Sequence, residues 1–297
     1  MPLQIRKFDP TTMKPGRITM VIGKRGTGKS VLMRDILYHM SNKVDFGVAM
    51  TPTEESAREF EKCMPKSWVY RGFEQEKLDD IVRVQKEKAQ SGSSGAKQLY
   101  VVLDDCSYDK KIMKTETMRF LTANGRHVNL TFVMAFQYLV DCPPDVRTNV
   151  DYVMCTREII LANKVKLWRY FFGVFDRYED FARVLDKCTA DYGVLVFDNT
   201  QPGASGDPIA NSIFWYRADP QLPTFRMGKE VYWKMSEQFE KNEYERRAER
   251  AEQAELKRLT TRGKRDPIVI QVTDERGNPL PPSGGRTGST SPRMIRM

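Results

Sequence analysis

The sequence has little of what would mark a metalloprotein, a secreted protein or a membrane protein. Its 297 residues include two histidines and five scattered cysteines, and no pair of cysteines has the spacing of zinc ligands. We therefore expect no zinc cluster, and we expect the cysteines to be reduced residues in or near the core of an intracellular protein. No apolar run approaches the roughly 18 residues of a membrane span. The first residues also lack the apolar stretch of a signal peptide.

Charged residues, by contrast, are plentiful and unequally divided between the two signs. The chain has 48 Lys and Arg against 39 Asp and Glu, which gives a net charge of +9 at pH 7. A basic balance favours phosphate-rich partners such as nucleic acid, through counterion release and electrostatic steering. The length allows one large α/β domain with appendages, or two small domains.

The most specific feature is the segment Gly23–Ser30, which matches the phosphate-binding loop G-x-x-x-x-G-K-[ST]. It lies between an apolar run, 18–22, and a helical pattern that begins at Val31, and this strand–loop–helix context is typical of a nucleoside triphosphate site. We expect Lys29 to reach the β- and γ-phosphates and the Ser30 hydroxyl to bind Mg²⁺. The residues expected to contact ATP are Gly23, Lys24, Arg25, Gly26, Thr27, Gly28, Lys29, Ser30 and Val31.

A second element places two carboxylates near this loop. The apolar run 99–103 predicts a buried parallel strand, and Asp104 and Asp105 follow it. Ligands of open α/β sheets lie outside the carboxyl ends of the strands, where the phosphate loop also lies. Asp104 is thus placed to hold Mg²⁺ through its water shell, and Asp105 to orient or deprotonate the attacking water. A turn or helix-capping role is the alternative for both.

Other polar residues follow further strand-like runs. Gln137 comes directly after the apolar run 130–136, which suits a sensor that contacts the γ-phosphate or the attacking water. Glu54 and Glu55 either stabilise the first turn of a helix or serve as an alternative base beside the nucleotide. Three arginines are candidates for an arginine finger, which one subunit places on the γ-phosphate bound by its neighbour: Arg126, Arg147 and Arg157. A structural salt bridge is the alternative role for each of them.

Strand-like and helix-like segments alternate over roughly the first two-thirds of the chain. This alternation predicts an α/β fold with a mostly parallel sheet and helices on both faces. We expect a P-loop NTPase of the RecA-like additional-strand class, in which an extra strand separates the phosphate-loop strand from the acidic strand. Expected strands are 17–22, 45–50, 99–103, 130–136, 150–155, 193–197 and 212–216, and expected helices are 29–40, 54–63, 77–88, 116–127, 163–172 and 178–187.

The chain is expected to divide into three parts. Residues 1–235 would form the ATPase domain, with a flexible Gly/Ser-rich insertion at about 89–98. Residues 236–260 are rich in charge and predict an exposed helix, either without a specific partner or in contact with DNA or another subunit. Residues 261–297 have the basic, Pro- and Gly-containing composition of a disordered tail.

Taken together, the ordered motifs resemble one family, the DNA-packaging ATPases of nucleocytoplasmic large DNA viruses, within the FtsK–HerA superfamily. The resemblance covers about 8–233. The segments that carry it are 22–30, 51–55, 102–106, 124–127, 135–138, 143–147 with Thr148 and Asn149, and 214–216.

The resemblance implies a Mg²⁺-dependent ATPase that forms a homo-oligomeric ring and drives double-stranded viral DNA into a preformed capsid. It implies Lys29 and Ser30 as nucleotide and metal ligands, Asp104 as the Walker B acid and Gln137 as the sensor. The superfamily often has Glu where this chain has Asp105, one methylene shorter, so the base is either Asp105 or Glu54/Glu55. DNA contact would be to phosphates and independent of sequence.

Further expectations follow from the same resemblance. Capsid, portal or membrane-vertex proteins are candidate partners, and the host cytoplasm or viral factory is the expected location, with virion association as an addition. The alternatives are a cellular-type DNA translocase or coupling ATPase and, from different classes, a P-loop small-molecule kinase and an NTP-binding scaffold with little hydrolysis. Stimulation of ATP turnover by duplex DNA separates the motors from the kinase and the scaffold.

Overall fold

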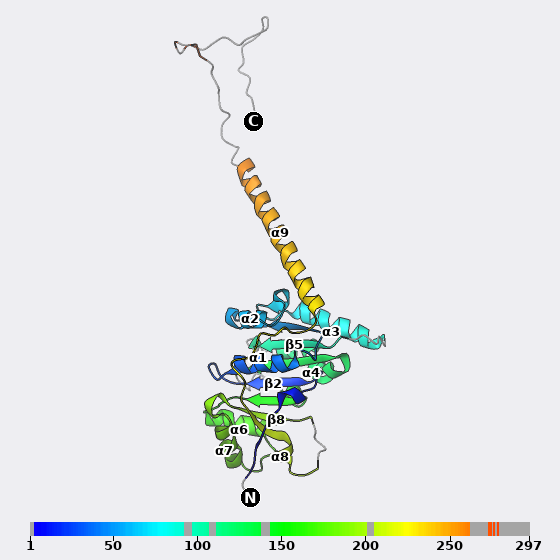
Figure 1. Cartoon of the computed structure of the whole chain (residues 1–297), viewed down its shortest axis with the longest axis vertical. Coiled ribbons are helices and arrows are strands. Elements are labelled where there is room, and N and C mark those ends of the chain that lie inside the picture. Colours follow the sequence, from blue (N-terminus) through cyan, green and yellow to red (C-terminus); the bar gives the residue numbers. More distant parts are fainter. Residues whose placement is uncertain are drawn as a thin grey trace. The chain divides into compact units, whose positions relative to one another are not determined.

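The computed structural model of the chain describes residues 3–91, 97–106, 111–137, 143–200 and 205–261, together with 273, 274, 276 and 278. Its contacts divide it into two units, residues 1–240 and residues 241–297. Within the described part of the first unit, the strands form one nine-stranded sheet in the order β1-β9-β8-β7-β2-β6-β5-β3-β4. Figure 1 shows β2 between β5 and β8. The strands are β1 (Arg6–Lys7), β2 (Ile18–Ile22), β3 (Phe46–Met50), β4 (Val69–Tyr70), β5 (Leu99–Asp104), β6 (Leu130–Phe136), β7 (Tyr152–Cys155), β8 (Val194–Asp198) and β9 (Ile213–Tyr216).

The sheet is mostly parallel, as the sequence predicts. Strand β8 is antiparallel to both of its neighbours, β7 and β9, and the other described pairings are parallel. Strand β6 lies between β2, which leads into the phosphate loop, and β5, which ends in the acidic pair. The predicted α/β fold with an additional strand is therefore confirmed.

Helices cover both faces of the sheet, because its central strands have apolar side chains on both faces. In β5, Val101 and Leu103 belong to one hydrophobic cluster, while Tyr100 and Val102 belong to the other. Helices α1 and α2 contribute to the second cluster, and α3, α4, α6 and α7 to the first. The described helices are α1 (Lys29–Met40), α2 (Glu54–Glu61), α3 (Gln75–Gln90), α4 (Glu116–Asn124), α5 (Pro144–Arg147), α6 (Leu161–Tyr170), α7 (Tyr178–Cys188), α8 (Pro208–Ser212) and α9 (Glu230–Thr261).

The observed elements differ from the predicted ones mainly at the edges. The two-residue strands β1 and β4 were not expected, and neither were the short helices α5 and α8. Helix α8 begins because Asp207 accepts a hydrogen bond from the N–H of Ile209, at 2.9 Å, with Pro208 in the first turn. The helix expected at 116–127 ends at Asn124 and continues as a 3₁₀ turn over Gly125–Val128.

Helix α9 is charged and starts earlier than the sequence suggests, at Glu230. Its first turns belong to the first unit, where the Tyr232 ring packs against those of Phe46 and Trp68. The Ser67 hydroxyl donates a hydrogen bond to Ser236 Oγ at 2.6 Å. In the second unit, the described residues of α9 up to Lys257 are exposed.

Several predictions concern residues that the description covers only in part. Residues 92–96 of the expected insertion, Cys142 and most of 262–297 lie outside the described residues. The four described cysteines are free, and Cys63, Cys106 and Cys155 are buried. Among the described helices, none has the length and apolar character that crossing a bilayer requires.

Candidate nucleotide-binding site

The phosphate loop connects the carboxyl end of β2 to the first turn of α1, and its backbone requires glycine at two places. Gly28 stands immediately before α1 with φ 87°, in the left-handed region that strains other residues. Gly23 lacks space for a side chain, because a Cβ there would lie 2.1 Å from the Thr156 hydroxyl oxygen. The loop therefore keeps its path only with glycine at both positions.

Thr156, the residue that follows β7, holds this loop in place, because β7 pairs with β2. The Thr27 hydroxyl lies 2.7 Å from the Lys24 carbonyl oxygen and 2.7 Å from the hydroxyl of Thr156, which follows β7 and is 1% exposed. The Thr156 N–H in turn donates to the Ile22 carbonyl at 2.9 Å. Sequence reasoning missed Thr156, since its contact with the loop depends on β7 pairing with β2 and no local motif predicts that pairing.

An ion pair fixes the other side of the loop to the same segment. Lys24 Nζ lies 2.9 Å from Glu158 Oε1. Burial works to raise the pKa of Glu158, but hydrogen bonds from the Ile160 N–H, Lys24 and Asn163 outweigh it and hold the pKa below the ordinary value. Glu158 is therefore ionised near neutral pH. The sequence contains no signal for this partner of the loop either.

Asp104 is the last residue of β5, and it is almost completely buried from solvent. The residue is 4% exposed, and burial raises its pKa. The charge of Lys29 and hydrogen bonds with the Ser56 and Thr51 hydroxyls oppose that rise without cancelling it. A carboxylate held in such surroundings is stabilised by any further cation that approaches it.

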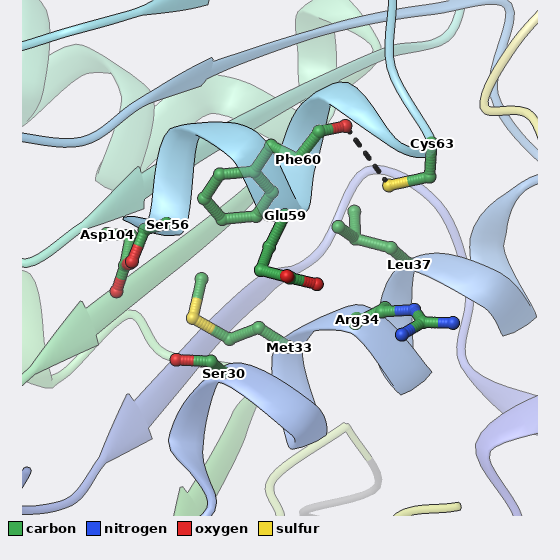
Figure 2. Close-up of a pocket in the computed structure, with 9 residues that line it drawn as sticks. All are labelled: Ser30, Met33, Arg34, Leu37, Ser56, Glu59, Phe60, Cys63 and Asp104. Carbon is green, nitrogen blue, oxygen red and sulfur yellow. Dashed lines mark hydrogen bonds between the residues drawn. The ribbon is translucent and has the colours of Figure 1, made fainter. Parts of the chain in front are cut away.

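Ser30 and Asp104 line one small pocket between α1 and α2, on the left side of the view in Figure 2. The other lining residues are Met33, Arg34, Leu37, Ser56, Glu59, Phe60 and Cys63. A hydroxyl and a carboxylate are the hard oxygen ligands that Mg²⁺ uses beside water and phosphate. Among the described residues, no group of three or more His, Cys, Asp or Glu could hold a metal ion by itself.

The second carboxylate and the predicted sensor are in direct contact. Asp105 follows β5 with φ 56°, a left-handed conformation that non-glycine residues adopt at a cost of about 1 kcal/mol or more. Gln137, which follows β6, donates a hydrogen bond from Nε2 to Asp105 Oδ2. The two residues meet because β5 and β6 are neighbours that end at the same edge of the sheet. Both were predicted as site residues from strand ends.

The alternative base occupies a different environment. Glu54 begins α2 with its side chain 52% exposed, and its carboxylate lies 2.8 Å from Arg71 Nε and 3.3 Å from Arg58 Nε. The hydrogen bond from Arg71 and, to a smaller extent, that from Arg58 lower the pKa of Glu54. Glu55 is exposed in the first turn of the same helix.

The candidate arginine fingers lie at opposite ends of the parallel strands: Arg126 and Arg147 near the amino ends, and Arg157 near the carboxyl ends. Arg126 is exposed in the turn before β6, where its Cα would lie 3.7 Å from a Cβ on Gly16. Arg147 ends α5, before β7, and its guanidinium lies 3.8 Å from the centre of the Tyr170 ring. Both precede parallel strands and thus lie at the edge opposite the phosphate loop. Arg157, exposed directly after Thr156, lies at the edge of the loop. Because a finger acts on a neighbour's nucleotide, its assignment stays a prediction.

Fold and loop define the class: this chain is a P-loop NTPase of the additional-strand type. Residues 6–168, more than half of the chain, match the family described as poxvirus A32 protein. The chain belongs to that family.

Relatives of the chain occur in large DNA viruses. Uncharacterized protein L437 of Acanthamoeba polyphaga mimivirus is 29% identical over 251 residues, which cover 82% of this chain and 86% of the relative. Uncharacterized protein 075L of Invertebrate iridescent virus 6 is 30% identical over 229 residues, covering 74% and 87%. Among solved structures, the genome packaging NTPase B204 from Sulfolobus turreted icosahedral virus 2, in complex with AMPPCP, shares the fold. Its TM-score is 0.51 at 15% identity, with 70% of this chain and 100% of B204 covered.

Proposed function

We propose that this protein is the genome-packaging ATPase of a virus, a motor that hydrolyses ATP to translocate double-stranded DNA into the capsid. The observation that carries the proposal is the meeting of the phosphate loop, Asp104 and the Asp105–Gln137 pair at one edge of a sheet with the additional strand β6. Membership in the poxvirus A32 family supports it, and so does the relation to proteins of other large DNA viruses.

In this proposal the loop and the buried acid hold the nucleotide and its metal. Backbone N–H groups of Gly23–Ser30 and the first turn of α1 bind the phosphates, and Lys29 contacts the β- and γ-phosphates. Ser30 and Asp104 would hold Mg²⁺, which when bound neutralises charge on the phosphates. The braces from Thr156 and Glu158 keep the loop in shape, so that binding does not have to order it.

Asp105 is the proposed base for the attacking water. It takes a proton from the water as the new bond to the γ-phosphorus forms and the bond to the β–γ bridging oxygen breaks, which releases ADP. Gln137 orients the Asp105 carboxylate through its amide, and in this proposal it also senses the γ-phosphate. We prefer Asp105 to Glu54, because two arginines hold the Glu54 carboxylate and lower its affinity for a proton.

The proposed motor is a homo-oligomeric ring with ATP at the subunit interfaces. In a head-to-tail ring, two different surfaces of each subunit meet. Arg126 and Arg147 lie at the edge opposite the loop, so either is eligible to reach the γ-phosphate of a neighbour. Contacts to DNA would be made to phosphates, in the viral factory of the infected cell or in association with the virion, with capsid or portal proteins as partners.

ATP hydrolysis by the purified protein, with and without double-stranded DNA, tests the proposal. We expect DNA to stimulate turnover and Lys29→Ala to abolish it. Asp105→Asn should lower kcat by about 10²- to 10⁴-fold, the usual contribution of a general base, while ATP binding persists. Glu54→Gln is the matched substitution at the competing carboxylate, and it should leave kcat close to wild type.

The opposite outcomes are equally clear. Turnover that ignores DNA would contradict the motor and favour a kinase. A large loss in Glu54→Gln with little loss in Asp105→Asn would reverse the assignment of the base. Binding to unrelated duplexes should weaken steeply with salt and differ little between sequences.

A further inference from the structure

A large aromatic side chain lies exposed against the phosphate loop, and none of the roles above uses it. Tyr192 is 71% exposed. Its ring carbon Cδ1 lies 3.3 Å, and its Cγ 4.0 Å, from the position that a Cβ would take on Gly28. Gly28 immediately precedes α1, where the phosphates of a nucleotide would bind. Tyr192 therefore borders the candidate site on the side of the loop toward which a side chain at position 28 would point.

The reversed strand explains how a residue so distant in sequence reaches the loop. Tyr192 stands in the connection between α7 and β8, two residues before β8 begins at Val194. Because β8 runs antiparallel to β7, its amino end lies at the edge where the parallel strands have their carboxyl ends. The connection into β8 consequently arrives beside the phosphate loop.

The connection holds Tyr192 in a defined place although the side chain is exposed. Asp191 and Tyr192 both have left-handed backbone conformations, with φ 49° and 59°. The Gly193 N–H donates to the Ala190 carbonyl at 2.8 Å, and a Cβ on Gly193 would lie 2.1 Å from the Cys188 carbonyl oxygen. Thr189, 1% exposed, anchors the turn through a 2.7 Å hydrogen bond from its hydroxyl to the Leu185 carbonyl. Non-glycine residues persist in such conformations only where the surroundings fix them, and functional sites are common among these places.

We propose that Tyr192 is the platform on which the nucleobase of the bound nucleoside triphosphate stacks. This inference rests on the proposed function, since it takes the loop to bind the triphosphate. A base extends from the phosphates through the ribose, and an exposed ring beside the loop offers it an apolar face. Stacking uses the face of the base and is tolerant of its identity, so Tyr192 would support nucleoside triphosphates of different bases without reading the base edge.

The test separates the base from the phosphates. Binding of ATP and of tripolyphosphate, which has no base, is measured by calorimetry for wild type, Tyr192→Ala and Tyr192→Phe. Tyr192→Ala should weaken ATP binding by roughly 5- to 150-fold, the range for loss of one base-stacking ring. It should leave tripolyphosphate binding within about twofold of wild type. Tyr192→Phe keeps the ring and should bind ATP like wild type. Tyr244→Ala, which removes a tyrosine that is 76% exposed in α9, is the matched control and should change neither affinity.

Each other outcome has a separate meaning. Equal loss of ATP and tripolyphosphate binding in Tyr192→Ala would overturn the inference, because it would show damage to the loop. If wild type binds ATP and Tyr192→Ala binds it equally well, the inference alone fails. If wild type binds neither ligand, the proposed function fails and the inference with it.

Discussion

Replacement of Thr156 by Val tests whether the strand beside β2 tunes the phosphate loop. The substitution keeps the branched shape and removes the hydroxyl that lies 2.7 Å from Thr27 Oγ1. Thr27 is not left with an unpaired donor, because its own hydroxyl also lies 2.7 Å from the Lys24 carbonyl. The Thr156 hydroxyl also lies 3.4 Å from the Ile22 carbonyl oxygen, which keeps its hydrogen bond from the Thr156 N–H. The expected loss is therefore mainly the net value of one partly buried hydrogen bond, about 1 kcal/mol.

That free energy should appear in ATP binding. A loop that loses its brace samples other conformations, and ATP must then select the competent one. If the full 1 kcal/mol is lost to binding, the Kd for ATP rises about fivefold. The assay is ATP binding by calorimetry, with the free energy of unfolding measured in parallel by urea denaturation.

The control is the same Thr→Val substitution at the opposite end of the strands, near the start of β6. Thr131 is buried in β6 and accepts hydrogen bonds from the Gly16 N–H at 2.7 Å and from Gln98 Nε2 at 3.3 Å. Thr131→Val leaves a buried N–H without this acceptor, so it should cost about 1–3 kcal/mol of stability. It should nevertheless bind ATP like wild type. Unchanged ATP affinity in Thr156→Val, or an equal rise of the Kd in Thr131→Val, would refute the role given to the brace.

Two further predictions concern stability. Asp35 is fully buried in α1 and accepts a hydrogen bond from the Tyr216 hydroxyl, and burial raises its pKa above 3.8, the ordinary value. The folded state therefore binds this proton more readily than the unfolded state. The contribution to stability is complete below the ordinary value and is lost as the pH rises through the raised pKa. We expect Asp35→Asn to remove this fall in the free energy of unfolding with rising pH, measured by urea unfolding over a pH series. A pH profile equal to that of wild type would contradict the role given to Asp35. Ser236→Ala should cost about 1 kcal/mol, because it removes a buried acceptor from Ser67. Glu237→Ala, at an exposed site, is the control, and equal stability of the two variants would show that the Ser67–Ser236 contact does not stabilise the fold.

The central strands could be predicted from the sequence because their physics is local. Strands β2, β5 and β6 are buried on both faces, so each is a continuous apolar run, and β6 has the predicted bounds Leu130–Phe136. The edge strands β1 and β4 have two residues each, and pairing with β9 and β3 defines them. Such short segments contain no period that would indicate a strand.

The site divides in the same way. Lys29, Ser30, Asp104, Asp105 and Gln137 follow strands or lie in the loop motif, so their positions along the chain indicate their edge of the sheet. Thr156, Glu158 and Tyr192 contact the loop only because β7 pairs with β2 and β8 runs in reverse. A strand order and a strand direction are tertiary facts, and no single segment of the sequence encodes them.

The spatial order of three strands bears on how ATP and catalysis are coupled. Along the chain β5 precedes β6, but in the sheet β6 lies between β2 and β5. The end of β6 thus lies next to both the phosphate loop and the acidic pair: the Gly23 N–H donates to the Phe136 carbonyl at 3.0 Å, and Gln137 donates to Asp105. A change at Gln137 when the γ-phosphate leaves would act on the Asp105 carboxylate directly, with no intervening residue. For this reason, substitution of Gln137 should disturb the chemical step more than the binding of ATP.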